Sequence, residues 1–379
     1  MNRYHDIDNL VIPDNIDVNL PYKYVNGVQL FNIYYYLKYD FINLIHILGA
    51  RGIGKSYDIF ELLYLNRKPG KEFLLLKTTT GDLQKITTEK GNPYNVYCAD
   101  KGLLDRQGKP LICVEKDGEE YYFCERDPDG NIISKFGRAI ALLSGSRGVD
   151  YSNVDIIFYD EFIPDPGVIV QKISEQYTAF NNLLESVIRN REMFGFDIPL
   201  VILASNSTSL ANEMTRGLNL VKVYEKMYKN GDTLYIDRFR NLLAVYPYLE
   251  EYSTKKKKTW LYRLNHGTEF EKMSVDNEFS YDSFFAVNSK KLVEYRPLVR
   301  IDNITIFKHK SIRNRYYACN ARADCEVYFL KETIDVFYKK YYMRLRDSVY
   351  NGNMIFSDYE TKKTILDIFG NIQKYRKKK

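Results

Sequence analysis

Several features that are scarce or missing in this sequence exclude whole classes of protein. The 379 residues contain no run of about eighteen uncharged apolar residues, so we expect no membrane-spanning helix. Residues 1–9 include two aspartates and no apolar core, which predicts that the protein remains in the cell that makes it. The five cysteines are odd in number and form no C-x-x-C pair. We therefore expect free thiols in a reducing compartment, with neither a disulfide framework nor a zinc site.

Length and charge distribution favour two domains. A chain of 379 residues is longer than one hydrophobic core usually organises. Its net charge of +6 divides unevenly, because residues 1–210 carry −6 and residues 211–379 carry +12. This split suggests that a part which hydrolyses nucleotide is joined to a part that contacts a polyanion, either nucleic acid or an acidic protein surface. A solvated basic face without a partner would produce the same charge.

A glycine-rich motif follows the apolar run at residues 41–48. Its residues fit G-x-x-x-x-G-K-[ST] at every fixed position and are Gly49, Ala50, Arg51, Gly52, Ile53, Gly54, Lys55 and Ser56. Glycines let backbone N–H groups converge on phosphate oxygens, and the helix expected to begin near Gly54 adds the positive end of its dipole. Lys55 would reach the β- and γ-phosphates of ATP, and Ser56 would bind Mg²⁺. The alternative is a chance match on a glycine-rich turn.

Two further apolar runs end in polar residues. Residues 154–159 precede Asp160 and Glu161, and residues 200–204 precede Ser205 and Asn206. Asp160 is expected to hold Mg²⁺, Glu161 to polarise the water that attacks the γ-phosphate, and Asn206 to sense the state of the nucleotide. A solvated turn at Asp160 and ordinary turn chemistry around Asn206 are the competing interpretations.

These patterns predict an α/β fold in three parts. Residues 1–210 are expected to form a P-loop ATPase domain of the ASCE class, with a mainly parallel sheet between helices and an inserted β-excursion at residues 91–137. Residues 211–246 look helical and charged, as in a linker, and residues 247–379 are expected to form a smaller, basic α+β domain. In the first domain we expect strands at residues 41–48, 73–76, 154–159 and 200–204 and helices at residues 28–39, 54–66 and 173–193.

Four arginines could contact a nucleotide. Arg51 lies inside the glycine-rich motif, Arg147 is flanked by small residues, and Arg189 and Arg191 lie near the end of a predicted helix. An arginine supplied by a neighbouring subunit can stabilise the charge that develops on a transferred phosphoryl group. The ordinary alternatives are a turn contact for Arg147 and favourable charge at the end of a helix for Arg189 and Arg191.

Basic residues mixed with aromatic ones recur in the C-terminal part. Lys255 to Lys258 precede Trp260, and further basic groups occur at residues 308–317 and 374–379. Such groups would neutralise nucleic-acid phosphates, which gives binding that depends on salt concentration and not on base sequence. The carboxylates of this part are scattered, so we assemble no metal-binding nuclease triad from them.

The motifs, taken in chain order, resemble those of the DNA-packaging ATPases of phi29-like tailed phages. The resemblance covers residues 1–210 and rests on the arginine within the phosphate loop, the Ser-Arg-Gly element before the Asp-Glu strand, and the asparagine after the next strand. The family's trans-acting basic residues would fall near Arg147 and Arg189, with Arg191 fitting the second nearly as well. Its cis-acting residues would correspond to Lys55, Ser56, Asp160, Glu161 and Asn206.

The resemblance also implies partners and a location. It implies a pentameric ring, docked on the portal of an empty procapsid in the host cytoplasm and absent from the mature virion, that drives double-stranded DNA inward. The C-terminal part would be a vestigial RNase H-like domain that binds without cleaving, and a packaging RNA could meet it. Two other functions stay open, namely another ring ATPase such as a helicase, and a structural adaptor that binds ATP and barely hydrolyses it. Glu161 argues against the adaptor, which needs no base.

Overall fold

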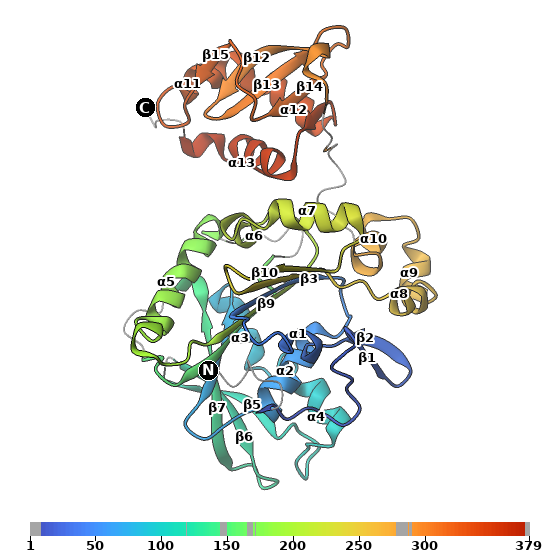
Figure 1. Cartoon of the computed structure of the whole chain (residues 1–379), viewed down its shortest axis with the longest axis vertical. Coiled ribbons are helices and arrows are strands. Elements are labelled where there is room, and N and C mark those ends of the chain that lie inside the picture. Colours follow the sequence, from blue (N-terminus) through green and yellow to red (C-terminus); the bar gives the residue numbers. More distant parts are fainter. Residues whose placement is uncertain are drawn as a thin grey trace. The chain divides into compact units, whose positions relative to one another are not determined.

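The computed structural model describes residues 9–118, 120–144, 150–164, 170, 172–277, 287 and 290–375. The chain divides into two compact units, whose elements are labelled in Figure 1. The large unit comprises residues 1–208 and 212–278, and the small unit comprises residues 209–211 and 279–379.

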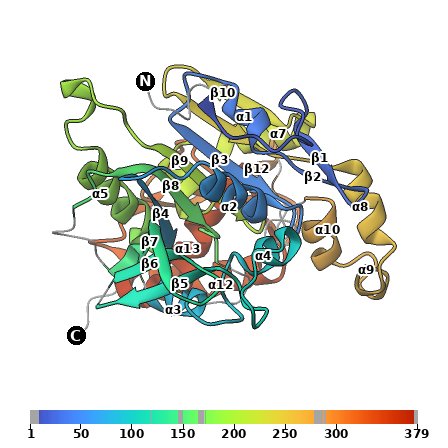
Figure 2. The same ribbon diagram turned by 90° about the horizontal axis from the view of Figure 1, so that it is seen from below.

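A nine-stranded sheet forms the centre of the large unit (Figures 1 and 2). The six strands from β11 to β7 in sheet order run parallel, whereas β10 at one edge and β6 and β5 at the other run antiparallel to their neighbours. In sheet order the strands are β10 (Leu234–Asp237), β11 (Leu242–Val245), β3 (Leu44–Gly49), β9 (Leu200–Asn206), β8 (Val154–Asp160), β4 (Glu72–Lys77), β7 (Ile132–Ala141), β6 (Glu120–Arg126) and β5 (Ile112–Asp117). The predicted mainly parallel α/β sheet is confirmed.

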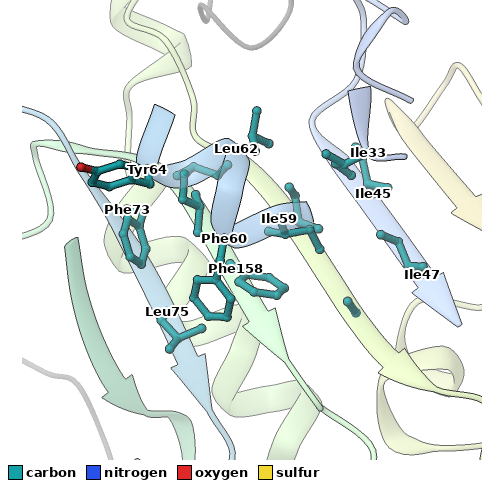
Figure 3. Close-up of a cluster of buried hydrophobic side chains, with 14 of the residues drawn as sticks. Ile33, Ile45, Ile47, Ile59, Phe60, Leu62, Tyr64, Phe73, Leu75 and Phe158 are labelled. Atoms are coloured by element: carbon teal, nitrogen blue, oxygen red, sulfur yellow. The ribbon is translucent and has the colours of Figure 1, made fainter. Parts of the chain in front are cut away.

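Helices cover both faces of this sheet. Phe158 of β8 packs against Phe60 of α2 (Lys55–Leu65), with ring centroids 5.3 Å apart. The next residue, Tyr159, packs against Phe180 of α5 (Gln176–Ile188) at 6.3 Å. Because successive side chains of a strand point to opposite faces, α2 and α5 lie on opposite sides of the sheet. Figure 3 shows the α2 side, where Phe60 lies beside Phe158 and the strand residues of β4.

Smaller elements complete the large unit. A hairpin and a short helix precede β3, so the expected helix at residues 28–39 is a strand followed by a single turn of helix. These elements are β1 (Tyr22–Val25), β2 (Val28–Phe31) and α1 (Tyr34–Leu37). The remaining helices are α3 (Thr80–Ile86), α4 (Asn95–Lys101), α6 (Glu213–Gly217), α7 (Val221–Asn230), α8 (Glu250–Lys257), α9 (Trp260–Leu264) and α10 (Glu269–Val275).

The large unit extends further along the chain than the sequence indicated. The expected linker at residues 211–246 contains α6 and α7 but continues into β10 and β11, and β11 pairs in parallel with β3. All four residues of β11 are buried, so this short apolar strand adds to the core. The structure therefore places the boundary near residue 278 and not at residue 210. Likewise, the β-excursion does not form a separate insertion, because β7 pairs in parallel with β4 and extends the main sheet.

The small unit is an α+β fold, as expected. Its five strands lie in the order β15 (Glu326–Tyr328), β12 (Tyr295–Ile301), β13 (Ile304–His309), β14 (Tyr316–Cys319) and β16 (Met354–Phe356). Apolar residues of α11 (Ile334–Phe337), α12 (Met343–Tyr350) and α13 (Tyr359–Tyr375) share one core with these strands. With the observed boundary, residues 279–379 carry a net charge of +10 and residues 1–278 carry −4.

Two general expectations can be compared with the structure. Among the helices in the described ranges, none combines the length and apolar character needed to cross a bilayer. All five cysteines are described, and each is a free thiol.

Candidate nucleotide-binding site

The carboxyl ends of three neighbouring strands lie at one edge of the sheet. β3 leads into the phosphate loop (residues 49–56), β8 ends at Asp160 and β9 ends at Asn206. The three strands are parallel and adjacent in the order β3, β9, β8. Ligands of open α/β sheets bind at this edge. The structure therefore brings together residues that are more than a hundred positions apart in the sequence.

The phosphate loop follows a backbone path that requires glycine at two positions. Gly52 has φ 82° and Gly54 has φ 88°, both in the left-handed region that residues with a Cβ rarely adopt. A Cβ at residue 52 would also lie 2.7 Å from the hydroxyl oxygen of Tyr252. Gly54 is the N-cap of α2, so the first N–H groups of this helix have no partner within the helix. The loop and the start of α2 are therefore suited to bind an anion.

Lys55 is buried beneath the loop. Its Nζ donates hydrogen bonds to the carbonyl oxygens of Gly49 at 3.0 Å and Ala50 at 2.8 Å, and lies 3.4 Å from Oδ1 of Asn206. Burial lowers the pKa of Lys55 to about 7, with smaller lowering from nearby Lys256 and Arg51, although Asp160 acts in the opposite direction. A buried cation whose direct partners are neutral oxygens would be stabilised by a polyphosphate.

Asp160 links the phosphate loop to a residue that the sequence analysis did not single out. Its Oδ1 accepts a hydrogen bond from the hydroxyl of Ser56 at 2.8 Å, and its Oδ2 lies 2.8 Å from Nζ of Lys77. Lys77 is the last residue of β4, and its side chain is only 10% exposed. Burial acts to lower the pKa of Lys77, but the ion pair with Asp160 outweighs it, so the pKa is raised. Lys77 therefore neutralises the carboxylate that was predicted to hold Mg²⁺.

Glu161 is placed differently from Asp160. Its backbone N–H continues the sheet by donating to the carbonyl of Ala204 at 2.8 Å, and its φ of 55° turns the chain away from the strand. Its side chain is 64% exposed, and its Oε2 lies 3.9 Å from Nζ of Lys77. The carboxylate is thus available at the surface of the site, whereas that of Asp160 is held within it.

Two cavities meet at these residues. The first, of about 460 Å³, is lined by the phosphate loop, Lys55, Ser56, Asp160, Glu161 and Asn206. The second, of about 180 Å³, shares Asp160, Glu161 and Asn206 and adds Lys77 and α3. The described residues contain no group of three or more His, Cys, Asp or Glu that could hold a metal ion alone. Mg²⁺ is commonly held by one or two carboxylates together with substrate phosphates, so Ser56 and Asp160 fit a metal that arrives with a nucleotide.

Comparison with known proteins identifies the family. Residues 118–365 match the family model described as podovirus DNA encapsidation protein (Gp16). The chain belongs to this family. Three DNA packaging proteins of Bacillus phages are similar to it. The protein of phage PZA is 28% identical over 256 residues, that of phi29 is 29% identical over 249, and that of B103 is 30% identical over 254. The alignments span 67%, 65% and 67% of these relatives and 65–67% of this chain.

Solved structures of packaging motors share the fold of this Gp16 family member. One chain of the phi29 viral genome packaging motor assembly aligns with a TM-score of 0.55 and 21% identity, over 92% of this chain and 99% of that one. The Phi-28 gp11 DNA packaging motor aligns with a TM-score of 0.52 and 15% identity, with the same coverage. Both alignments include the small unit, so the likeness in fold extends well beyond the region of the sequence motifs.

The predicted arginine fingers have different surroundings in this Gp16 family member. Arg147 lies outside the described residues. Arg191 is bound within its own chain, because its guanidinium donates to the carbonyl of Val154 at 2.8 Å and to that of Tyr151. Arg189 is exposed at the end of α5, where its positive charge acts on the carboxylate of Asp150. The guanidinium of Arg191 is thus held within its own chain, whereas that of Arg189 is exposed.

A second part of the site comes from residues that were assigned to the basic C-terminal domain. Lys256 of α8 donates to the backbone carbonyl of Arg51 and, at 2.9 Å, to that of Ser274, while the hydroxyl of Tyr252 lies 3.3 Å from the same Arg51 carbonyl. Burial, and then the charge of Arg51, lower the pKa of Lys256 to about 8. Lys256 therefore supports the phosphate loop and is not part of a uniformly solvated basic face.

Proposed function

We propose that this protein is an ATP-driven motor that moves double-stranded DNA into a preformed procapsid. The observation on which the proposal rests most is the convergence of Lys55, Ser56, Asp160 and Asn206 at the ends of three parallel strands. Because the chain belongs to the DNA encapsidation family, DNA packaging is the process in which such a site would act.

The described contacts suggest a role for each side chain. Lys55 and the amides of the phosphate loop would bind the β- and γ-phosphates of ATP, and Ser56 with Asp160 would hold Mg²⁺. Bound Mg²⁺ would offset the negative charge of the phosphates. Glu161, exposed beside both cavities, would accept a proton from the attacking water, and Asn206 would orient that water.

The finer assignments of partners follow from the resemblance to phi29-like packaging ATPases. We propose a homopentameric ring that docks on the portal of the procapsid in the host cytoplasm, with Arg189 or Arg147 reaching the nucleotide of the neighbouring subunit. The small unit, with its net charge of +10, would contact DNA, the portal or a packaging RNA without cleaving nucleic acid.

Hydrolysis and packaging assays test the proposal. We expect the purified protein to hydrolyse ATP, and to do so faster with DNA and empty procapsids than alone. We also expect it to package DNA into the procapsids, where the DNA resists nuclease. Glu161→Gln should keep nucleotide binding and lose at least about 100-fold in turnover. Glu89→Gln, at an exposed carboxylate away from the phosphate loop, is the matched control and should behave as the unaltered protein.

Three results would contradict the proposal. Unchanged turnover of Glu161→Gln would remove Glu161 from its role as base. Strand separation of a forked duplex would favour a helicase, and nucleotide binding with negligible turnover in all conditions would favour a structural adaptor.

Mixing two variants tests whether an arginine of one subunit acts on the nucleotide of the neighbouring subunit. A preparation of Lys55→Ala subunits and one of Arg189→Ala subunits should each be inactive. Mixed rings should regain part of the activity, because some boundaries pair an intact Lys55 with an intact Arg189. Absence of any recovery for Arg189, together with recovery for Arg147→Ala in the same design, would assign the finger to Arg147.

A further inference from the structure

A short loop after α5 exposes three large apolar side chains. Met193, Phe194 and Phe196 are 81%, 72% and 67% exposed, and we call them the loop patch. The loop has a defined backbone, because the N–H of Phe196 donates to the carbonyl of Arg191 at 2.8 Å and Gly195 has φ 73°. Large apolar groups that are held together in water mark an interaction surface more often than scattered ones do.

Helix α9 exposes a second apolar group on the same unit. Trp260, Leu261 and Leu264 are 70%, 43% and 66% exposed, and we call them the helix patch. Trp260 and Leu264 are four residues apart, so they share one face of the helix. The opposite side of α9 is anchored by Tyr262, which is buried and stacks on Phe270 with ring centroids 5.7 Å apart.

The two patches lie on opposite sides of the large unit. Figures 1 and 2 show α5, after which the loop patch follows, on one side of the sheet and α9 on the other. A single copy cannot bring them together without unfolding, but one patch of one copy can meet the other patch of the next. Such a head-to-tail contact builds a closed ring when the rotation between copies closes.

The loop patch lies at the end of β8 opposite to the carboxylates of the site. Two residues before Met193, Arg191 donates to backbone carbonyls at the start of β8, and β8 ends at Asp160. Arg189, the exposed arginine, lies four residues before Met193. A neighbour that covers the loop patch would therefore also lie next to Arg189.

The helix patch is connected to the phosphate loop. The ammonium of Lys256 lies 5.0 Å from the ring centroid of Tyr262 and donates to the carbonyl of Arg51 within the phosphate loop. The loop patch thus lies next to Arg189, which would act on another copy. The helix patch lies next to the phosphate loop, on which Arg189 of another copy would act.

The charged residues that directly flank the two patches are complementary. Glu192 and Asp197 flank the loop patch, and both are exposed. Lys258 and Arg263 flank and interrupt the helix patch, and they are exposed as well. Opposite charges around an apolar centre favour the pairing of the two different patches over the pairing of either patch with itself.

We propose that the loop patch of one copy docks on the helix patch of the next copy and thereby brings Arg189 to the neighbour's phosphate loop. The proposal rests on the proposed function for the role of Arg189, whereas the docking itself is independent of nucleotide hydrolysis.

Sedimentation velocity of the full chain, over a series of concentrations with and without ADP, tests the docking. We expect Phe194→Asp and Leu264→Asp each to raise the dissociation constant for self-association about 30-fold or more, as for residues at the centre of an interface. Thermal stability and the binding of labelled ADP by the monomer should not change. Phe239→Asp, at a residue 97% exposed elsewhere on the large unit, is the matched control and should associate normally.

A mixture of the two variants separates head-to-tail pairing from symmetric pairing. Each variant alone should stay monomeric, but the mixture should form dimers and nothing larger, because one intact loop patch can meet one intact helix patch. Dimers in either variant alone would overturn the proposal, as would an unaltered protein that remains monomeric throughout.

Two further outcomes are informative. Normal self-association of both variants, with loss of binding to procapsids alone, would assign the patches to another partner and overturn the proposal. If the unaltered protein associates as expected but fails to bind ADP, the proposed function fails and the docking stands.

Discussion

At the scale of single residues, the ion pair between Lys77 and Asp160 is the contact that the motifs did not reveal. Lys55, Ser56, Asp160 and Asn206 could be selected because the chemistry of nucleotide hydrolysis requires their residue types after apolar strands. Lys77 also comes at the end of an apolar strand, β4. A lone lysine there matches no motif, so only the contact distance of 2.8 Å to Asp160 reveals its role.

Lys77→Met should destabilise the protein in the absence of divalent metal. Removal of one member of a buried ion pair leaves an unpaired charge on Asp160, at a cost of about 3 kcal/mol in the free energy of unfolding. We expect Mg²⁺ alone to restore part of this stability, because a divalent cation can neutralise the same carboxylate, whereas the unaltered protein should gain little from Mg²⁺ alone.

Urea unfolding with EDTA and with Mg²⁺ measures both effects. Lys71→Met is the control, since Lys71 is an exposed lysine that lines neither cavity of the site. Equal Mg²⁺ dependence of the unaltered protein and Lys77→Met would show that Lys77 does not compete with a cation at Asp160.

At the scale of elements, α8 is the part of the site that sequence reasoning placed elsewhere. Its run of four lysines indicates a basic surface, and three of them are exposed. Lys256 instead bonds the carbonyls of Arg51 and Ser274. Composition could not separate Lys256 from its neighbours, because the difference depends on which face of the helix meets the phosphate loop.

Lys256→Met should weaken nucleotide binding without removing any phosphate ligand. Loss of its hydrogen bonds removes one donor each from the carbonyls of Arg51 and Ser274 and loosens the loop, which we expect to raise the dissociation constant of ADP roughly tenfold. Fluorescence titration with labelled ADP provides the measurement. Lys258→Met, on an exposed lysine of the same run, should bind ADP as the unaltered protein does. An unchanged affinity for Lys256→Met would mean that the loop keeps its shape without α8.

At the scale of the whole molecule, the sequence identified the fold class and four of the parallel strands, but it misplaced the boundary between the units. Long apolar strands such as residues 154–159 and 200–204 are strong signals, and both were found within two residues of their ends. β11 has only four residues and follows a charged stretch, so it could not be told from a helical linker until its pairing with β3 was known.

Two truncations test the observed boundary. A fragment of residues 1–278 keeps the complete sheet, whereas one of residues 1–210 exposes the edge of β3 that β11 covers. Because an unpaired apolar edge strand promotes aggregation, we expect the longer fragment to be soluble and to bind ADP and the shorter one to aggregate. Size-exclusion chromatography and circular dichroism distinguish these outcomes. A soluble, nucleotide-binding fragment of residues 1–210 would show that β10 and β11 are dispensable.

The pairing of β3 with β11 also affects the order of events during synthesis. The strand that leads into the phosphate loop leaves the ribosome about two hundred residues before the strand that covers its edge and the helix that supports the loop. Translation at about 5–20 residues per second therefore imposes a delay of roughly ten seconds or more. Nascent chains would pass through this interval with an unfinished sheet, so they would bind nucleotide at full affinity only after residue 256 has emerged.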